Sequence, residues 1–245
     1  MASDWIVPAP SDDWALFLDV DGTLIDIAPT PDSVRVSPGL PQLLDRLCTR
    51  FGGSLALISG RPIAVLDELF RPFRFPAAGI HGVERRDVQG RMHYSGLTAE
   101  ALDPARIELR RFVERHPGLL LEDKGRSLAI HFRQIPHLER QVQAFVQTLL
   151  PSLPPQIQVQ PGHFVIEIKS AAANKRTAIE QFMQEPPFAG RVPVFLGDDV
   201  TDRDGFQYVE QEGGHALFVG PSPESGRGWL PNPGAVREWL RSLLQ

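Results

Sequence analysis

The sequence predicts an α/β protein in which a doubly wound parallel sheet is interrupted by a smaller inserted α/β unit. Continuous apolar segments, typical of strands buried on both faces, alternate with helical patterns before Gly82 and again after Ser170. Between these two regions, apolar and polar residues alternate with period two, as in an antiparallel sheet with one covered face. We therefore expect a core made of residues 1–85 and 170–245 and an inserted unit made of residues 86–169.

The core elements are expected from apolar segments and helix boundary signals. The first part of the core should contain a strand in WALFLDV, a helix between Ser37-Pro38 and Gly52-Gly53, a strand in SLALIS, a helix opening at Pro62 and a short strand in AAGI. The second part should contain a helix at about 175–183, a strand in VPVFLGDD, a helix that carries Asp202, a strand in HALFVG and a closing helix at about 235–244. The segment PSPESGRGWLPNPG is expected to be a loop.

The inserted unit is expected to begin with a hairpin and to continue as a sheet with two helices. The segment VERRDVQGRMHY is typical of a hairpin whose turn is Gln89-Gly90. Strands are expected in LLLEDK, SLAIHFR, IQVQ and FVIEIK, and helices at about 99–116 and 138–150. The segments 82–86 and 170–174, which join the unit to the core, are expected to act as hinges.

Composition and charge exclude several classes of protein. The chain has 245 residues, 42% of them hydrophobic and 22% charged, which suits a folded core. A formal net charge of −5 argues against a general nucleic-acid binder. The single Cys48 cannot form an internal disulfide. No apolar segment approaches the roughly 18 residues that cross a membrane, and no targeting pattern opens the chain, so we expect a cytoplasmic protein.

Four ends of strands or helices carry the residues that predict chemistry. In an open parallel sheet, the ligand site lies at the carboxyl ends of the strands. Asp19 and Asp21 end the first strand, and because they occupy positions i and i+2 of extended chain, their carboxylates are expected to face one site. The other three ends supply Ser59 with Gly60, Lys175, and the acids Asp198, Asp199 and Asp202.

This residue set predicts a site for a divalent cation and a phosphate group. Neighbouring carboxylates repel one another, and a hard cation such as Mg²⁺ holds them ionised together. One Asp would attack phosphorus while its neighbour moves the leaving-group proton. The expected phosphate-binding residues are Asp19, Val20, Asp21, Gly22, Thr23, Ser59, Gly60 and Lys175. A simpler alternative stays open for Ser59 and for Asp199, because each residue could instead cap a helix.

The motifs DVDGT, SGR, a lone lysine and GDDVTD, in this order, resemble those of the haloacid dehalogenase-like phosphotransferase superfamily. The resemblance implies a Rossmann-like core, an inserted cap and Mg²⁺-dependent phosphoryl transfer, with Asp19, Asp21 and Lys175 as catalytic residues. It makes Asp19 the nucleophile that forms an aspartyl-phosphate. It makes Asp21 the acid that protonates the leaving oxygen and then the base that activates water. The implied metal site contains Asp19, the backbone carbonyl of Asp21 and Asp198, with Asp199 and Asp202 completing the acidic set.

Further segments resemble one family within this superfamily, the trehalose-6-phosphate phosphatases. These segments are FLDVDGTLIDIAPTPD, SGRP, GIHG, HFR, EIK and LGDDVTD. The resemblance implies a small-molecule sugar phosphate as substrate and the hydrolysis of trehalose 6-phosphate. It also allows an association with a trehalose-phosphate synthase, although we expect the chain itself to be a monomer. Arg203 departs from the TDE sequence of the family, and we expect it to affect local ion pairing more than the chemistry.

Polar side chains on the strands of the inserted unit indicate how a sugar would be held. Glu122 and Lys124 lie on one face of their strand, and Glu167 and Lys169 likewise lie on one face of theirs. Carboxylates accept hydrogen bonds from neighbouring sugar hydroxyls, and the resemblance implies that cap glutamates and a lysine hold the distal glucose. The residues expected to bind the sugar are Glu122, Lys124, His131, Arg133 and Glu167. The alternative is a solvated sheet face with cross-strand ion pairs.

Two other functions stay open at this point. A phosphatase for sucrose 6-phosphate or mannosyl-3-phosphoglycerate would use the same core and would differ only in its cap. A catalytically silent module that binds a sugar phosphate or a synthase is less expected. Such a module would be expected to lose the nucleophile or the acid, whereas Asp19, Asp21, Lys175 and Asp198 are all present.

Overall fold

The chain forms two compact units. The computed structural model describes residues 5–28, 30, 33–162, 164–223 and 226–245. The first unit, called the core unit below, comprises Met1–His93 and Asn174–Gln245, and the second, the cap unit, comprises Tyr94–Ala173. The expected boundaries at residues 86 and 169 therefore lie too early in the chain. The reason is that the hairpin of β4 (Glu84–Arg86) and β5 (Met92–Tyr94) extends the core sheet instead of opening the cap unit.

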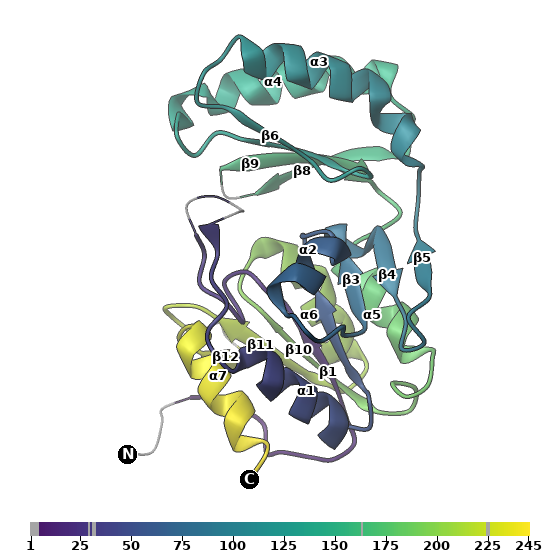
Figure 1. Ribbon diagram of the computed structural model, residues 1–245, viewed down its shortest axis with the longest axis vertical. Helices are drawn as coiled ribbons and strands as arrows, with labels where there is room; N and C mark the ends of the chain where they lie inside the picture. The colour runs from purple at the N-terminus through teal and green to yellow at the C-terminus, as the bar shows by residue number, and fades with distance from the viewer. Residues whose placement is uncertain (1–4, 29, 31–32, 163, 224–225) are drawn as a thin grey trace. The chain divides into compact units, whose positions relative to one another are not determined.

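The core unit is built on a mixed sheet. Within the described residues this sheet has eight strands in the order β12-β11-β10-β1-β2-β3-β4-β5 (Figure 1). The strands not yet defined are β1 (Trp14–Leu18), β2 (Leu55–Ile58), β3 (Ala77–Gly79), β10 (Val192–Gly197), β11 (His215–Val219) and β12 (Gly228–Leu230). Neighbouring strands from β12 to β3 are parallel, and β4 runs antiparallel to β3. The short β12 lies in the segment that was expected to be a loop; residues 224 and 225 of that segment lie outside the described residues.

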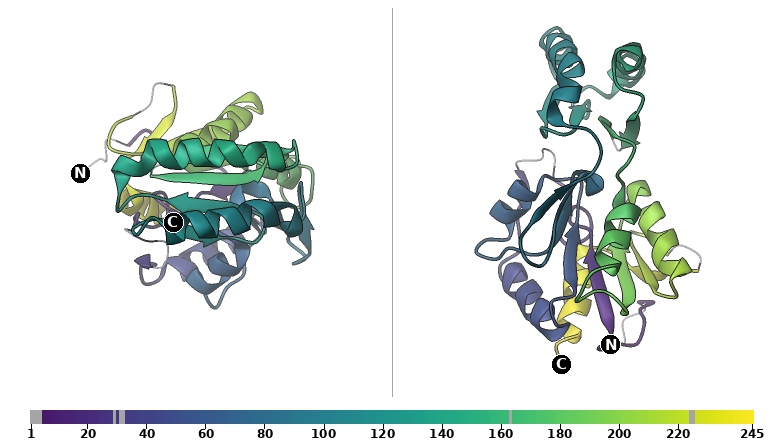
Figure 2. Two further views of the ribbon diagram at one scale, coloured as in Figure 1. Left: turned by 90° about the horizontal axis from the view of Figure 1, so that it is seen from above. Right: turned by 90° about the vertical axis from the view of Figure 1, so that its right-hand side faces the viewer.

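Helices cover both faces of the core sheet (Figure 2). Side chains alternate along β1, so that Leu16 and Leu18 face one apolar cluster while Ala15 and Phe17 face the other. The first cluster includes residues of α1 (Leu40–Arg50), α2 (Ile63–Leu69) and α7 (Pro233–Ser242). The second includes residues of α5 (Lys175–Met183) and α6 (Arg203–Gln211). This arrangement confirms the expected doubly wound α/β core.

The predicted start of α1 is wrong in detail. The N-cap of α1 is Gly39, whose φ of 79° is left-handed, and no side chain of the described residues caps the helix there. Ser37 contributes its backbone carbonyl instead, which accepts a hydrogen bond from the N–H of Leu40. Glycine takes this backbone conformation at little cost, which lets the chain turn into the helix without a capping hydroxyl.

The cap unit is an antiparallel sheet with two helices on one face. The sheet order is β6-β7-β9-β8, with β6 (Leu120–Asp123), β7 (Leu128–His131), β8 (Ile157–Gly162) and β9 (Val165–Ser170). Figure 2 shows α3 (Asp103–Glu114) and α4 (Glu139–Leu149) lying side by side. Apolar residues of both helices, Leu109, Phe112, Val142 and Val146, pack with Ile130 of β7 and Ile168 of β9 on one face of the sheet. The polar residues of the strands therefore lie on the opposite face.

Short 3₁₀ helices connect several of these elements. They are η2 (Ile80–Gly82) and η6 (Val200–Asp202) in the core unit, and η3 (Ala99–Leu102), η4 (Pro136–Leu138) and η5 (Leu150–Ser152) in the cap unit. Throughout the described residues, no helix combines the length and the apolar character needed to cross a membrane.

Candidate active site

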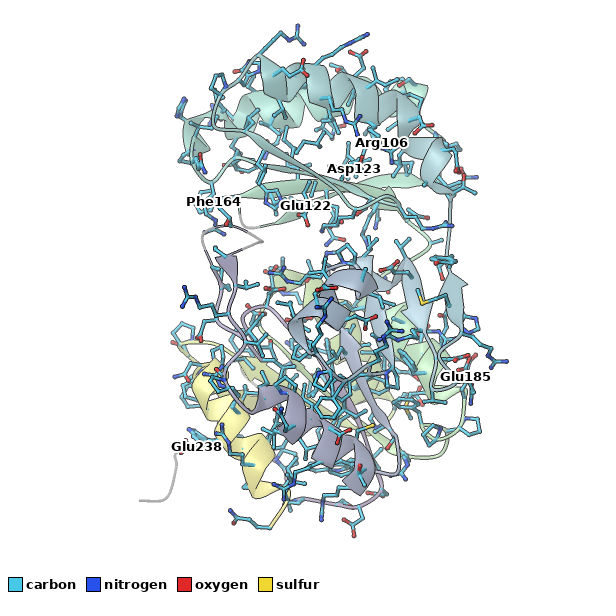
Figure 3. All side chains as sticks on the ribbon, in the orientation of Figure 1. Arg106, Glu122, Asp123, Phe164, Glu185 and Glu238 are labelled. Atoms are coloured by element: carbon cyan, nitrogen blue, oxygen red, sulfur yellow. The ribbon has the colours of Figure 1, made fainter. Side chains whose placement is uncertain are left out.

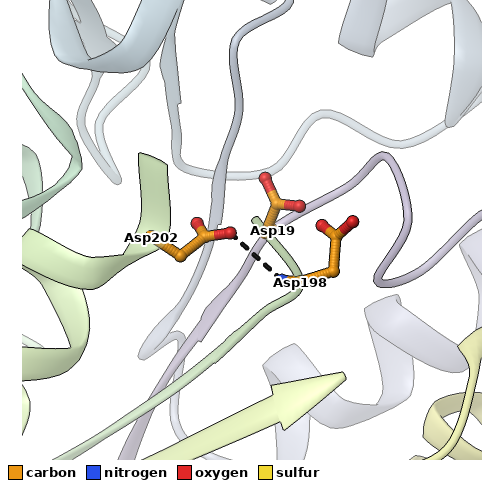
Figure 4. A group of neighbouring side chains, drawn as sticks. All are labelled: Asp19, Asp198 and Asp202. Atoms are coloured by element: carbon orange, nitrogen blue, oxygen red, sulfur yellow. Dashed lines mark hydrogen bonds between the residues drawn. The ribbon is translucent and has the colours of Figure 1, made fainter. Parts of the chain in front are cut away.

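Two neighbouring parallel strands bring the first acids together. β1 pairs with β10 in a register that places Leu18 opposite Leu196, so Asp19 and Asp198 follow at the same edge of the sheet. The N–H of Asp19 continues this pairing by donating to the carbonyl of Leu196 at 3.0 Å. Figure 4 shows Asp19 and Asp198 beside Asp202. The site thus lies at the carboxyl ends of the strands, where an open parallel sheet binds its ligands.

Lys175 links two of these acids from the other side. Its ammonium nitrogen lies 2.6 Å from Oδ1 of Asp19 and 2.5 Å from Oδ1 of Asp202. Lys175 is the first residue of α5, and Asn174 caps this helix by accepting a hydrogen bond from the N–H of Thr177. The cap fixes where the helix begins and therefore where the buried ammonium lies.

Asp202 positions the other groups. Its Oδ1 accepts from Lys175, and its Oδ2 accepts from the N–H groups of Asp198 at 3.1 Å and Asp199 at 3.0 Å. Figure 4 marks the hydrogen bond to the N–H of Asp198. Both oxygens of this fully buried carboxylate therefore hold protein groups. Asp202 orients the loop that carries Asp198 as well as Lys175.

The electrostatics of the cluster favour an added cation. Burial raises the pKa of Asp19, although Lys175 acts in the opposite direction. Burial, reinforced by the nearby Asp202, raises the pKa of Asp198 to about 7. Burial alone would lower the pKa of Lys175, but Asp19 and Asp202 outweigh it and raise that pKa above its ordinary value. The acids thus need more positive charge than the one ammonium supplies to remain ionised.

The same residues fit a hard metal ion. Carboxylate oxygens of Asp19, Asp198 and Asp202 all lie within 4.8 Å of one another. The carboxylate of Asp198 also lies against Gly22, where a Cβ would come within 2.0 Å of its Oδ2, so any larger residue at position 22 would displace it. Three carboxylates supply oxygen ligands of the kind that a cation such as Mg²⁺ prefers. Neither Asp21 nor Asp199 contributes a side chain to this group.

Asp21 has a different partner from Asp19. Its two carboxylate oxygens accept from Nε and Nη2 of Arg61 at 2.7 and 2.8 Å. This bidentate pair fixes the orientation of Asp21 more strongly than a single hydrogen bond would. Sequence reasoning missed Arg61 as the partner of Asp21. The available signal was its position directly after Ser59 and Gly60, where it follows the end of a buried strand.

Ser59 is not a helix cap. It is buried, and its Oγ accepts from the N–H of Arg61 at 3.1 Å, which closes a tight turn after β2. The first residue of α2 is Ile63, and its N–H donates to the carboxylate of Glu84 instead. The Glu84 carboxylate thus ties β4 to the start of α2 and to the turn that carries Ser59 and Arg61. Sequence reasoning missed this role of Glu84 as well.

Asp199 serves as a local cap. Its Oδ1 accepts from the N–H of Val200 at 2.6 Å, and its own N–H donates to Asp202. These bonds form a capping box at the start of η6. The alternative reading of Asp199 as a cap therefore describes its observed contacts, and the acids gathered for a cation are Asp19, Asp198 and Asp202.

The polar face of the cap sheet carries cross-strand pairs. Glu122, labelled in Figure 3, pairs with His131 at 2.8 Å, and Lys124 pairs with Glu167 at 3.2 Å. Glu122 and Glu167 both stand opposite Ala129 in the strand register, which places them in one row. The expected grouping of these polar residues is thus present, and so are the ion pairs of the alternative reading.

The remaining cap residues have separate contacts. The guanidinium of Arg133, beyond the end of β7, lies 5.2 Å from the centre of the Phe164 ring. Lys169 is fully buried, and its ammonium donates to the carbonyl of Ala173 at 2.7 Å. Lys169 therefore holds the segment that leads out of β9 in place.

Comparison with known proteins identifies the family. The model of the family described as trehalose-phosphatase matches residues 17–226, which is most of the chain. The chain belongs to the trehalose-phosphatase family. The match includes all the motif residues from Asp19 to Asp202, which confirms the family resemblance seen in the sequence.

Two curated relatives of this trehalose-phosphatase family member extend over almost its whole length. A protein of Sinorhizobium fredii named probable trehalose-phosphate phosphatase is 42% identical over 95% of this chain and 88% of its own. The trehalose-6-phosphate phosphatase of Escherichia coli is 41% identical over 96% of this chain and 88% of its own. A solved haloacid dehalogenase-like hydrolase from Bacteroides thetaiotaomicron, 17% identical, matches 93% of this chain and 98% of its own with a TM-score of 0.65, and so shares the fold.

Arg203, where the resemblance implies a glutamate, lies at the edge of the site. Arg203 is the first residue of α6, directly after Asp202, and its side chain is exposed. The preceding Asp202 keeps its contacts with Lys175 and with the N–H groups of Asp198 and Asp199. An arginine at position 203 is therefore compatible with the observed contacts of Asp202.

Proposed function

We propose that this chain is a Mg²⁺-dependent phosphatase that hydrolyses trehalose 6-phosphate to trehalose and phosphate. The observation that carries the proposal is the cluster in which the buried Asp19, Lys175 and Asp202 meet the partly buried Asp198 beside the ends of β1 and β10. The names of relatives at 41% and 42% identity support the choice of substrate. Family resemblance supports the roles of the individual residues.

In the proposed reaction Asp19 is the nucleophile. Its carboxylate oxygen attacks phosphorus, an aspartyl-phosphate forms, and the bond between phosphorus and the sugar oxygen breaks. Asp21 gives its proton to that leaving oxygen. It then takes a proton from the water that attacks the aspartyl-phosphate, which releases phosphate and restores Asp19. Arg61 holds both oxygens of Asp21, so proton donation to the leaving oxygen requires Arg61 to release one of them.

Charge and hydrogen bonds in the site suit the phosphate group. Mg²⁺, held by Asp19, Asp198 and the carbonyl of Asp21, would supply positive charge to the phosphate oxygens. Lys175 adds a second positive charge while keeping Asp19 in place. The proposed phosphate donors are the hydroxyl of Ser59, the ammonium of Lys175 and the backbone N–H groups of residues 20–23 and 60.

We further propose that the polar face of the cap sheet binds the sugar. Glu122, Lys124 and Glu167 are the main contacts in this proposal, with His131 and Arg133 as further members. Paired carboxylate oxygens and an ammonium complement the many hydroxyls of a disaccharide. The row formed by Glu122 and Glu167 across the cap sheet supports this assignment.

Phosphate release from a panel of esters tests the proposal. The panel contains trehalose 6-phosphate, sucrose 6-phosphate, glucose 6-phosphate and nitrophenyl phosphate, each with Mg²⁺ and with a chelator. We expect a strong preference for trehalose 6-phosphate and loss of release with the chelator. A preference for sucrose 6-phosphate, or equal rates on all four esters, would overturn the substrate assignment. No release from any ester would favour a silent binding module.

A further inference from the structure

We propose that Ser127 is a positioning residue for Glu167 and that it thereby sets the affinity of the cap unit for the sugar. The inference rests on the proposed function, because it assumes that the polar face of the cap sheet binds the sugar. Ser127 lies just before β7 and belongs to none of the motifs that suggested the sugar contacts. Its side chain is nevertheless fully buried and bonded to one of the proposed contacts.

The turn between β6 and β7 places Ser127 by backbone geometry. The N–H of Lys124 donates to the carbonyl of Ser127 at 3.0 Å, which closes the turn. Gly125 has a left-handed φ of 77°, and its N–H donates to the carboxylate of Asp123 at 3.0 Å. The two ends of this turn, Lys124 and Ser127, are thereby held at a fixed separation.

Both ends of the turn converge on one oxygen of Glu167. The hydroxyl of Ser127 lies 2.6 Å from Oε1 of Glu167, and the ammonium of Lys124 lies 3.2 Å from the same oxygen. The shorter of these contacts has the length of a charge-assisted bond between a hydroxyl and a carboxylate. Glu167 itself is buried, on the central strand pair of β7 and β9. Two donors from one rigid turn therefore fix the rotamer of this carboxylate.

The orientation of Glu167 by these two donors matters because glutamate is a flexible side chain. A glutamate that is free to rotate loses conformational entropy when it binds a ligand, whereas an oriented one has already lost it. The hydroxyl of Ser127 orients Glu167 without adding a charge, and it supplements Lys124, which also belongs to the proposed sugar contacts. Without the hydroxyl, Lys124 alone of these two donors would remain bonded to Oε1. The position of Lys124 would in turn depend on Glu167.

The test compares variants on two substrates with intact protein and Mg²⁺. For Ser127→Ala we expect KM for trehalose 6-phosphate to rise about tenfold, with kcat for that substrate changed less than about twofold. The ratio of kcat/KM for trehalose 6-phosphate to that for nitrophenyl phosphate, an ester without the sugar, should fall by the same factor. Ser127→Cys is nearly the same size but a weak donor, and it should behave like the alanine variant.

Two controls separate the inference from its alternatives. Ser54→Ala removes an equally buried hydroxyl that donates to the backbone carbonyls of Trp14 and Phe51 in the core unit, and it should leave the substrate ratio unchanged. Glu167→Gln should raise KM for trehalose 6-phosphate at least as much as Ser127→Ala. Thermal unfolding of each variant shows whether it is folded. If Ser127→Ala does not fold, the test is made with Ser127→Cys instead.

The outcomes distinguish the inference from the function on which it rests. If Glu167→Gln lowers the substrate ratio and both Ser127 variants do not, Ser127 has only a structural role and the inference is wrong. If Glu167→Gln leaves the ratio as it is, the proposed sugar contact fails, and the inference fails with it. An equal fall in the ratio for Ser54→Ala would show that general destabilisation explains the effect, and it would also overturn the inference.

Discussion

Lys175 is the residue on which the arrangement of the buried acids depends most. It brings together Asp19, which is 156 residues away in the sequence, and Asp202, which is 27 residues away. All three side chains are buried, so water does little to screen their charges. Removing one partner of a buried ion pair is costly, because the charge of the other partner is left buried and uncompensated.

Lys175→Met is therefore expected to destabilise the protein and to abolish catalysis. Methionine keeps much of the length of lysine but leaves Asp19 and Asp202 facing each other without a cation. We expect the free energy of unfolding at pH 8 to fall by about 3–5 kcal/mol and phosphate release to disappear. Urea denaturation and a phosphate assay measure the two effects. Arg203→Met, at an exposed position nearby, should change the stability by less than about 0.5 kcal/mol. Equal stability of the two variants would contradict the ion pairs of Lys175.

Single residues of the site differ in how far the sequence predicts them. Asp19 and Asp198 are predictable as neighbours, because they directly follow buried strands that a parallel sheet places side by side. The contact between Arg61 and Asp21 is not, because it joins two loops through side chains whose rotamers no sequence pattern specifies. The same holds for Ser127, since a serine in a turn is usually explained by the turn alone.

At the scale of elements, the start of α2 is held by a side chain from another strand. Within the described residues, this seven-residue helix has no side-chain cap of its own at Pro62, and the carboxylate of Glu84 accepts from Ile63 N–H in its place. Glu84 is on β4, at the edge of the parallel part of the sheet. Through α2 it supports the turn in which Ser59 and Arg61 lie.

Glu84→Ala is expected to loosen this turn. The loss of a capping carboxylate should lower the free energy of unfolding by about 1–2 kcal/mol and reduce kcat, because the start of α2 that follows the turn with Ser59 and Arg61 would be held less firmly. Glu84→Gln keeps an acceptor oxygen and should recover most of both losses. Glu68→Ala, on an exposed face of the same helix, is the matched control and should change neither quantity measurably. A Glu84→Ala variant with native kcat would refute the link between this carboxylate and the site.

The hairpin of β4 and β5 is organised by the carboxylate of Asp87. It accepts from the N–H groups of Gln89 and Arg91 and from the side chains of Arg91 and His93. Burial acts to raise the pKa of Asp87, but the hydrogen bonds from His93 and Arg91 outweigh it and hold that pKa well below its ordinary value. Because the folded state favours the ionised form, Asp87 contributes stability above the ordinary pKa, and this contribution is lost as the pH falls.

Asp87→Asn is therefore expected to have a pH-dependent effect. At pH 7 the variant should be less stable than the native chain, since it lacks the charge and one acceptor. As the pH falls below the ordinary aspartate value of about 4, the difference between the two proteins should shrink. Urea denaturation at pH 7 and pH 3 measures it, with Asp12→Asn, at an exposed position, as the control. A difference that stays constant over this range would contradict the hydrogen-bonded, ionised state of Asp87.

The elements that sequence patterns predict well are those with a clear apolar period. α5 begins and ends at the expected residues, and β1, β2, β10 and β11 coincide with continuous apolar segments. The errors fall where pairing with another element decides the structure. β12 is short, begins with Gly228 and is followed by Pro231, and it becomes a strand by pairing with β11. The hairpin of β4 and β5 looks like part of the insertion, but pairing with β3 adds it to the core sheet.

At the scale of the whole molecule, each unit has its own apolar core. Two clusters flank the core sheet and a third lies between the cap sheet and its helices. The acids that fit a cation all belong to the core unit, as do Lys175 and the loops that hold them. A bound cation should therefore stabilise the folded core unit against unfolding, by an amount that depends on its concentration relative to its dissociation constant.

Metal binding should depend on Asp198 and on pH. With Mg²⁺ at about 100 times its dissociation constant, stabilisation of about 2.7 kcal/mol is expected, which raises the Tm of a chain of this size by about 5–10 °C. The raised pKa of Asp198, about 7, means that a proton competes with the cation. In the metal-free protein this acid destabilises the fold increasingly as the pH rises toward 7, because the unfolded chain has already released the proton. The increase in Tm should therefore be larger at pH 8 than at pH 5.5.

A pair of neighbouring variants makes this measurement specific. Asp198→Asn removes a member of the acidic group and should abolish the increase in Tm with Mg²⁺. Asp199→Asn changes the next residue, whose carboxylate caps η6 and lies outside that group, and it should keep most of the increase. Equal loss in both variants would mean that Asp199 also binds the cation, as the acidic motif first suggested. An unchanged increase in Asp198→Asn would place the cation elsewhere and would remove Asp198 from the proposed metal site.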